Sequence, residues 1–583
     1  MRSQASLCIV SAVVLLGGLV PASPAGAAPR RPAEPDTAQL AGDLIHQRIG
    51  WENCEKLSTD PETDQLLHAV PGLACATVTV PRDWHHPRDG NTITLRVSKT
   101  ATSRPGADRQ GIALVNPGGP GGSGLAWGAA MAVRSPELAA SYDFIGFDPR
   151  GVGASTPLSC SYQIDPANTD PNVQTKAVVS GCRTMTPLAR YITTEQTAYD
   201  MDFLRALLGE RQTSYVGYSY GTWLGTWYAT TFPSRVHRML LDSSTDVSEP
   251  SLQKTWDLQT RSRDRAFQNQ FLPYVARHDA TYHLGTDPQA IRRQFERYGG
   301  NRGLYGKLIT ALIIIPAMYS KEIYPLAAEV LQGFIADKGQ IGGGDPEDAA
   351  VAAFRELVDR APATGVERTF LNKARSRAEQ ETRQTNAVFE AIRCQDGQWN
   401  QSLAHWRLNQ RDLDRNYTFI APLSRNGDDT LYPACAFWPT RNRMPLPNPR
   451  TFPKVMVVQS EMDAATAYEG AHDTARYLPG ARMISVDNEG SHGVFPYLTT
   501  CVDDPVISYF RHGSIPAAKY SACPALPLPG EDRAYDVGGR IGPGGTIHMR
   551  LVTGEVRRAN LMVHRMLRDQ ELDPNTGQPS PTP

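Results

Sequence analysis

A serine flanked by glycines marks the stretch GYSYG, residues 217–221. The pattern G-x-S-x-G, between a strand and a helix, is a nucleophile elbow, in which the glycines permit a sharp turn that presents the serine hydroxyl. Here an apolar strand precedes the turn, and a helical stretch, TWLGTWYATTFP, follows it. The start of that helix also helps to hold developing negative charge. We therefore predict that Ser219 is a nucleophile rather than part of an ordinary turn.

A serine hydroxyl is a poor nucleophile unless a base takes its proton, and that base is itself oriented by a carboxylate. Asp463 ends the apolar stretch KVMVVQSEMD, and His492 follows the next one, ARMISVDNEG. The chain order Ser, Asp, His, with each residue in a loop after a strand, is that of the α/β-hydrolase fold. We predict that Ser219, Asp463 and His492 form a catalytic triad.

Alternatives to the acid and the base remain open in the sequence. Glu461 and Glu489 are the fallback acids, and Asp463 could instead cap the helix expected over AATAYEGA. His492 could be an ordinary polar loop residue. His85 and His86 stand too early in the chain for the order that this fold requires.

The tetrahedral intermediate of acyl transfer needs two N–H donors for its negatively charged oxygen. We predict the backbone amide of Tyr220, directly after the serine, and the amide of Gly119. Gly119 lies in the glycine loop, PGGPGGSG, residues 117–124, which follows the strand IALVN.

The same loop formally fits G-x-G-x-x-G, a dinucleotide-binding pattern, with Asp143 about 20 residues further on. Pro120 would stiffen the phosphate turn, and an exported enzyme would meet little NAD, so we expect no dinucleotide. There is no C-x-x-C pair and no G-K-[ST] after a glycine loop. We predict no metal and no cofactor.

Strands and helices alternate over residues 111–244, which predicts a parallel α/β sheet. A hairpin, CATVTVPRDW and NTITLRVSKT, precedes this region, and mostly helical sequence follows it. Strand character returns near Lys454. The predicted fold class is therefore α/β: an α/β-hydrolase fold, a mostly parallel sheet with helices on both faces and an inserted helical cap domain.

The N-terminus has the three parts of a secretory signal peptide: Arg2, an apolar run from Leu7 to Val20, and the small residues Ala25-Gly26-Ala27. The run is too short to span a bilayer of roughly 30 Å. We predict a secreted, extracellular protein.

We expect the chain to be divided into six parts. They are a signal peptide (1–28), a polar tail or short propeptide (29–50), the first part of the hydrolase core (51–245), the helical cap insertion (246–445), the second part of the core (446–525) and a C-terminal extension of open role (526–583).

The charges are balanced, with 59 basic and 60 acidic residues. Such a balance gives no reason to expect a nucleic-acid or anionic-membrane partner. We expect a monomer that binds neither nucleic acid nor, once the signal is removed, a membrane.

Eight of the nine cysteines lie beyond the predicted signal peptide. They fall into four couples that are close in sequence, and nearest-neighbour pairing is the simplest hypothesis. Each bridge would close a loop worth roughly 3 kcal/mol in the chain-entropy model. The predicted pairs are Cys54 with Cys75, Cys160 with Cys182, Cys394 with Cys435, and Cys501 with Cys523.

Several motifs in the same order resemble those of the secreted tripeptidyl aminopeptidases of actinobacteria, which are α/β-hydrolase serine peptidases related to proline iminopeptidases. They are NPGGPGGSG, YDFIGFDPRGVGAS, GYSYGTWLG, CQDGQW, VVQSEMDAATAYEGA and GSHG. The resemblance runs from about Trp51 to Cys523 and implies the same triad and Gly119 on the oxyanion side. In one departure, Ala467 follows Thr466 where the family often has Thr-Pro. The resemblance also leaves about 60 C-terminal residues unmatched.

An aminopeptidase must recognise a free α-ammonium, which requires a carboxylate held at a fixed distance from the serine. Asp396, beside Cys394, is the first candidate because a disulfide there would hold it rigidly. Glu390 and Glu461 are the alternatives, and Asp396 could instead be a surface acid or a helix cap.

The function that the resemblance implies is that of a serine exopeptidase, which releases short peptides, tripeptides in that family, from substrates with free N-termini through an acyl-enzyme. A secreted esterase or lipase would use the same triad. The third hypothesis is a non-catalytic exported binding protein.

Overall fold

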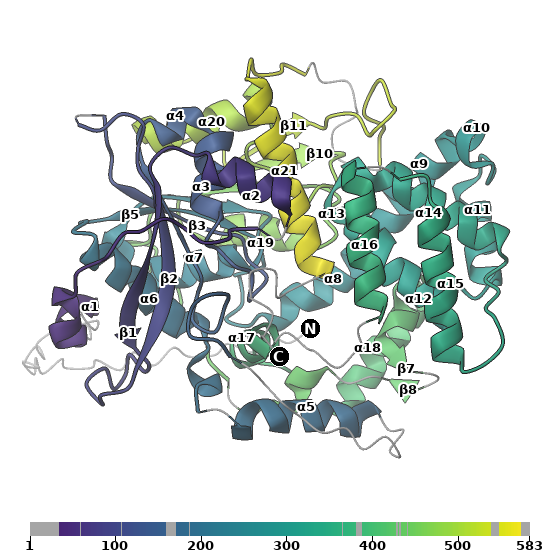
Figure 1. The fold of residues 1–583 in the computed structure, drawn as a ribbon, viewed down its shortest axis with the longest axis horizontal. Coiled ribbons are helices and arrows are strands. Elements are labelled where there is room, and N and C mark those ends of the chain that lie inside the picture. Colours follow the sequence, from purple (N-terminus) through teal and green to yellow (C-terminus); the bar gives the residue numbers. More distant parts are fainter. Residues whose placement is uncertain are drawn as a thin grey trace, which may run out of the picture. The chain divides into compact units, whose positions relative to one another are not determined.

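A computed structural model describes residues 34–58, 60–106, 108–158, 171–185, 187–363, 365–379, 387–426, 429–430, 433–439, 441–537 and 547–572. The chain from Asp36 onwards forms one compact unit (Figure 1). The predicted signal peptide lies outside the described residues.

A nine-stranded sheet is the centre of the fold, in the order β1-β2-β4-β3-β5-β6-β9-β10-β11. The first hairpin is antiparallel, β2 pairs antiparallel with β4, and every other neighbouring pair in this sheet is parallel. The predicted fold class is confirmed. The strands are β1 (Leu73–Pro81), β2 (Thr92–Thr100), β3 (Ile112–Asn116), β4 (Asp143–Phe147), β5 (Thr213–Tyr218), β6 (Val236–Asp242), β9 (Met456–Ser460), β10 (Arg482–Asp487) and β11 (Tyr520–Pro524), with β7 (Arg425–Asn426) and β8 (Asp429–Thr430) in a separate small ribbon.

Helices cover both faces of the sheet, which is why the central strands are apolar along their whole length. Every residue of β3, β5 and β9 is buried, as expected for parallel strands that are covered on both sides. One face packs against α6, α7 and α19, and the other against α3, α20 and α21. Outside the insertion the helices are α1 (Thr37–Ala41), α2 (Pro61–His68), α3 (Trp127–Arg134), α4 (Pro136–Ala139), α5 (Pro171–Met185), α6 (Thr194–Leu207), α7 (Tyr220–Thr231), α19 (Tyr468–Tyr477), α20 (Thr500–His512) and α21 (Gly554–Leu572).

The chain between β6 and β9 is largely helical (Figure 1). It has its own apolar cluster, made chiefly by α8 to α16, whereas α17 and η9 pack in the cluster on the α6–α7 face of the sheet. Its α-helices are α8 (Gln253–Ala266), α9 (Leu272–Arg277), α10 (Asp279–Tyr282), α11 (Pro288–Arg297), α12 (Leu304–Ile309), α13 (Ile315–Tyr319), α14 (Tyr324–Ala336), α15 (Pro346–Arg360), α16 (Gly365–Glu379), α17 (Ala387–Gln395) and α18 (Leu403–Asn416). The division at residues 246 and 445 stays a prediction.

Short helical turns connect these elements. Two are π-helical, η4 (Phe267–Phe271) and η6 (Thr310–Ile314). The 3-10 turns are η1 (Gly42–His46), η2 (Ala189–Tyr191), η3 (Pro233–Arg235), η5 (Gly300–Arg302), η7 (Lys321–Ile323), η8 (Ala421–Ser424) and η9 (Ala434–Ala436). Among the described residues, no helix is long and apolar enough to cross a membrane.

The C-terminal helix α21 contacts both the core and the insertion. It packs on α3 of the core and on α13 and α16 of the insertion (Figure 1). The strand-like segment before it is attached to the core, because Thr500 N–H donates to the carbonyl of His548 (2.9 Å) and Arg550 N–H donates to that of Leu498 (2.9 Å). The extension whose role the sequence left open is thus packed across the two regions.

Three of the four predicted cysteine pairs are disulfides: Cys54–Cys75, Cys394–Cys435 and Cys501–Cys523. The remaining pair includes Cys160, which lies outside the described residues.

Candidate active site

The serine predicted as nucleophile stands between β5 and α7 in a conformation that few side chains adopt. Ser219 has φ 55°, a left-handed value that is uncommon outside glycine. A Cβ on Gly217 would lie 2.5 Å from the carbonyl oxygen of Gly221, and one on Gly221 would lie 2.8 Å from that of Asn116. The backbone is therefore too close-packed at both positions for any residue but glycine, which explains the G-x-S-x-G pattern.

The glycine loop lies directly against this elbow. A Cβ on Gly118 would come within 2.5 Å of the carbonyl oxygen of Tyr218 and 2.8 Å of the Ser219 Cβ. Gly119 follows with φ 103°, and among the described residues its N–H has no hydrogen-bond acceptor. The loop and the serine predicted to work together are adjacent, and the amide of Tyr220 begins α7 immediately after Ser219.

Asp148, at the end of β4, anchors the far end of the glycine loop. Its carboxylate accepts hydrogen bonds from the Ser123 hydroxyl (2.5 Å) and from the N–H groups of Gly124 (3.1 Å) and Leu125 (3.3 Å). Burial raises the pKa of Asp148, and these hydrogen bonds oppose the rise. The far end of the loop is thus fixed by hydrogen bonds to one buried carboxylate.

The predicted acid and base are hydrogen-bonded to each other. His492 Nδ1 lies 2.9 Å from Asp463 Oδ2 and 3.0 Å from Oδ1. Asp463 is fully buried, and His492 is 2% exposed. Asp463 also accepts the N–H groups of Ala465 (2.8 Å) and Thr466 (2.9 Å). These bonds fix the carboxylate, so it can hold the imidazole in one orientation.

The insertion also contacts the histidine. The backbone N–H of His492 donates to the carbonyl of Tyr319 in α13 (3.0 Å), and the two rings meet edge to face at 5.0 Å. Tyr319 was not predicted from the sequence, where only its place in a long apolar run could be seen.

The two fallback acids have other partners. Glu461 accepts the N–H of Asn488 (2.7 Å). Glu489 forms an ion pair with Lys321 (2.7 Å) and is hydrogen-bonded to Tyr497. Its pKa is lowered to about 2, because Lys321 and these hydrogen bonds outweigh the desolvation that would raise it. Among the described residues, only Asp463 supplies a carboxylate to His492.

Asp396, the predicted amine anchor, is completely buried rather than a surface acid. Its Oδ2 accepts the N–H of Thr194 (3.0 Å), the first residue of α6, and also the Thr194 hydroxyl, which is bonded in turn to the Tyr220 hydroxyl. Asp396 therefore caps α6 and is linked through two hydroxyls to the residue after Ser219.

The other oxygen of Asp396 is poorly satisfied. Oδ1 has no hydrogen-bond partner among the described residues, and the nearby Asn442 side chain lowers the pKa of this carboxyl group. Burial raises the pKa of Asp396 to about 7, and the Thr194 bonds oppose that rise. A buried carboxylate with one unpaired oxygen is costly, and a cation would satisfy it.

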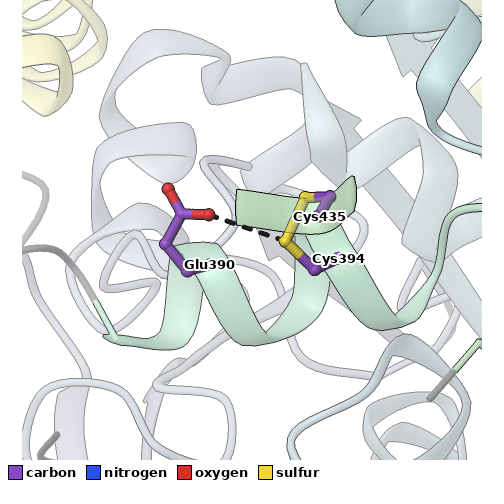
Figure 2. Close-up of side chains that lie close together, drawn as sticks. All are labelled: Glu390, Cys394 and Cys435. Carbon is purple, nitrogen blue, oxygen red and sulfur yellow. Dashed lines mark hydrogen bonds between the residues drawn. A yellow bond between two sulfur atoms is a disulfide. The ribbon is translucent and has the colours of Figure 1, made fainter. Parts of the chain in front are cut away.

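The disulfide beside Asp396 is shown in Figure 2, where Glu390 Oε2 lies 3.6 Å from Cys394 Sγ. Glu390, Cys394 and Cys435 bring their ligand atoms within 4.8 Å of one another. A metal would need free thiolates, but both sulfurs are joined in the disulfide. These three residues therefore do not fit a metal ion. Glu390, an alternative amine anchor, instead pairs with Arg393 (3.2 Å).

Asp242, at the end of β6, is a buried acid of the site that the sequence analysis did not identify. Its carboxylate accepts two N–H groups from the loop after His492, from Val494 (2.8 Å) and Phe495 (2.6 Å). An acid closing the apolar strand VHRMLLD, at the same edge of the sheet as Asp463, was the available signal.

Two family models and several known proteins match this chain. Residues 114–307 match the family model described as alpha/beta hydrolase fold, and residues 422–523 match that of the TAP-like protein. A tripeptidyl aminopeptidase of Streptomyces coelicolor is 33% identical, with 82% of this chain and 87% of the relative covered. The serine protease Hip1 of Mycobacterium tuberculosis is 27% identical over 82% of this chain and 92% of its own. A protein named carboxylesterase B, also of Mycobacterium tuberculosis, is 31% identical over 90% of this chain and 99% of its own.

Proposed function

Because this chain belongs to the tripeptidyl aminopeptidase family of α/β-hydrolase serine peptidases, we propose that it is a secreted exopeptidase that releases tripeptides from free N-termini. The observation that best supports the chemistry is the buried Asp463–His492 pair (2.9 Å), in the same unit as the elbow serine. The three disulfides support export, since such bonds persist in oxidising surroundings.

In the proposed reaction His492 Nε2 takes the proton of the Ser219 hydroxyl as the oxygen attacks the scissile carbonyl carbon. Asp463 holds Nδ1 protonated and stabilises the imidazolium that forms. The amides of Gly119 and Tyr220 hold the negative oxygen of the tetrahedral intermediate. His492 then gives its proton to the leaving amine, and the C–N bond breaks. Water attacks the resulting acyl-enzyme by the same route and frees the short peptide.

For the choice of substrate, we assign the α-ammonium to Asp396. Asp396 Oδ1 is buried without a hydrogen-bond partner among the described residues, and a bound cation would remove the energetic cost of leaving it unpaired. Hydrogen bonds through the Thr194 hydroxyl also connect Asp396 to Tyr220, the residue that follows Ser219. A nearby positive charge favours the ionised form of a carboxyl group. Binding of a free N-terminus would therefore lower the pKa of Asp396 from about 7.

The test compares kcat/KM for a free-amine tripeptide nitroanilide, such as Ala-Ala-Pro, with its N-acetylated twin and with a short nitrophenyl ester. We expect the wild type to prefer the free amine by about 100-fold or more, because truncating one partner of a buried charge pair costs roughly 2–5 kcal/mol. Asp396→Asn should raise KM for the free-amine substrate about 30-fold and leave ester hydrolysis within threefold of the wild type.

Glu390→Gln is the matched control, since Glu390 is an acid of α17, the helix that ends next to Asp396. It should leave the preference for a free amine unchanged. If only Glu390→Gln removed the preference, the anchor would be Glu390.

Asp396 also predicts a pH dependence. Below about pH 7 its carboxyl group becomes neutral and can no longer pair with the α-ammonium. We therefore expect kcat/KM for the free-amine substrate to fall more steeply with decreasing pH than kcat/KM for the ester.

An esterase is the second candidate, and the carboxylesterase-named relative at 31% identity favours it. An esterase does not require an amine anchor. Equal rates on the free and acetylated peptides, or activity on the ester alone, would support the esterase and reject the exopeptidase.

A further inference from the structure

Asp242 connects the two loops that carry the nucleophile and the base. Its backbone carbonyl accepts the N–H of Ser219 (3.0 Å). Its side chain accepts the N–H groups of Val494 (2.8 Å) and Phe495 (2.6 Å). One residue at the end of β6 thus holds both the nucleophile elbow and the loop that follows His492.

Ser243 binds the same loop one residue earlier than Asp242 does. Its hydroxyl accepts the N–H of Gly493 (2.8 Å), so three consecutive amides after His492 are bound by two adjacent side chains. The carbonyl side of the loop is bound as well, because the Phe495 carbonyl accepts hydrogen bonds from the Tyr218 hydroxyl (2.6 Å) and from Arg134 Nη2 (3.1 Å). Tyr218 immediately precedes Ser219, which joins the two loops a second time.

The position of Asp242 is costly to maintain. The residue is fully buried, and desolvation raises its pKa to about 7 against the bonds from Phe495 and Val494 and the charges of Arg134 and His492. A buried acid is expensive unless its hydrogen bonds are satisfied. The triad does not use this acid, whose carboxylate instead binds the loop that follows His492.

We propose that Asp242 is a positioning residue that sets the separation between Ser219 and His492 by binding the backbone on both sides. The proposal rests on the triad roles assigned under the proposed function. The separation between Ser219 and His492 matters for the rate, because misplacing a reacting group by about 1 Å can lower the rate on the order of 100-fold.

Asp242→Asn is the variant that tests this role. Its amide offers one oxygen acceptor in place of two, and its NH₂ group would face an N–H. We expect kcat for the preferred substrate, and the rate of inactivation by a fluorophosphonate, to fall about 10- to 100-fold. KM should stay within threefold, because Asp242 is fully buried and both of its carboxylate oxygens are bound to backbone amides.

Asp503→Asn is the matched control. Asp503 is also fully buried and accepts two consecutive N–H groups of the same loop, from Tyr497 (2.7 Å) and Leu498 (2.8 Å). The loss of Tm should be similar in the two variants, whereas kcat of Asp503→Asn should stay within threefold of the wild type. Equal loss of kcat in both variants, or an unchanged kcat in Asp242→Asn, would overturn the proposal.

Ser243→Ala provides a second test if Asp242→Asn does not fold. It removes only the acceptor of the Gly493 N–H, and we expect kcat to fall about 3- to 10-fold with KM unchanged; an unchanged kcat would also overturn the proposal. Failure of the triad assignment has a different result, namely that the wild type itself is not inactivated by the fluorophosphonate. Failure of the exopeptidase assignment alone would show as equal rates on the free and acetylated peptides, with inactivation of the wild type retained.

Discussion

Ser219→Ala is expected to lower kcat by about 10⁶-fold on every substrate that the wild type cleaves, the scale seen when a catalytic serine is removed. Without the hydroxyl no acyl-enzyme can form, and the remaining rate comes from the oxyanion donors and substrate binding alone. KM should change little. Tm should change little as well, because serine and alanine both carry a Cβ and are strained to a similar degree at the φ of 55° that this position has.

The measurement is a single-turnover rate together with intact mass after treatment with a fluorophosphonate. Wild-type protein should gain one adduct on the tryptic peptide that contains Ser219, and the variant should gain none. Ser214→Ala is the control, since Ser214 is buried on the same strand, β5, far from the elbow end. A Ser219→Ala protein that kept most of its activity would show that the nucleophile lies elsewhere.

Asp463→Asn has the next largest expected effect, a fall in kcat of about 10⁴-fold, as for the corresponding change in other triads. The asparagine oxygen can still accept the N–H groups of Ala465 and Thr466. Its NH₂ group would then face His492 Nδ1, which would have to act as an acceptor. The proton would move to Nε2, and the imidazole could no longer take the serine proton.

Glu461→Gln is the control for this prediction, because Glu461 is the acid two residues before Asp463 and binds only the N–H of Asn488 in the site described. Its kcat should change little, because Glu461 is not hydrogen-bonded to His492. A large loss in Glu461→Gln with a small loss in Asp463→Asn would exchange the roles of the two acids.

Local sequence was sufficient to predict the elbow and the sheet. Close backbone approach at Gly217, Gly118 and Gly221 can be met only by glycine, and strands buried on both faces are apolar throughout. Both constraints act within a few residues and leave a pattern in the sequence. Ser219, Asp463 and His492 could be identified as candidates because each follows a predicted strand and their order along the chain is that of the α/β-hydrolase fold.

Contacts between distant segments could not be predicted in the same way. The carboxylate of Asp242 meets an amide 253 positions away, and Asp396 meets Thr194 across 202 positions. Nothing near either acid in the sequence specifies such a partner. The packing of α21 across the core and the insertion is of the same kind.

The strand β11 was missed for a different reason. Its five residues, YSACP, pair with β10 at the edge of the sheet, and most of them are partly or fully exposed. A short edge strand needs neither the alternation nor the continuous apolar run by which strands are identified.

Cleavage from a free chain end can be followed through the products of one peptide, about ten residues long, in two forms. One form has a free N-terminus, the other an acetylated one, and both are followed by mass spectrometry over time. We expect the free form to lose a tripeptide from its N-terminus, then a second one, while the acetylated form stays intact. Internal fragments, or cleavage of both forms at the same rate, would show that the enzyme is not an exopeptidase of this kind.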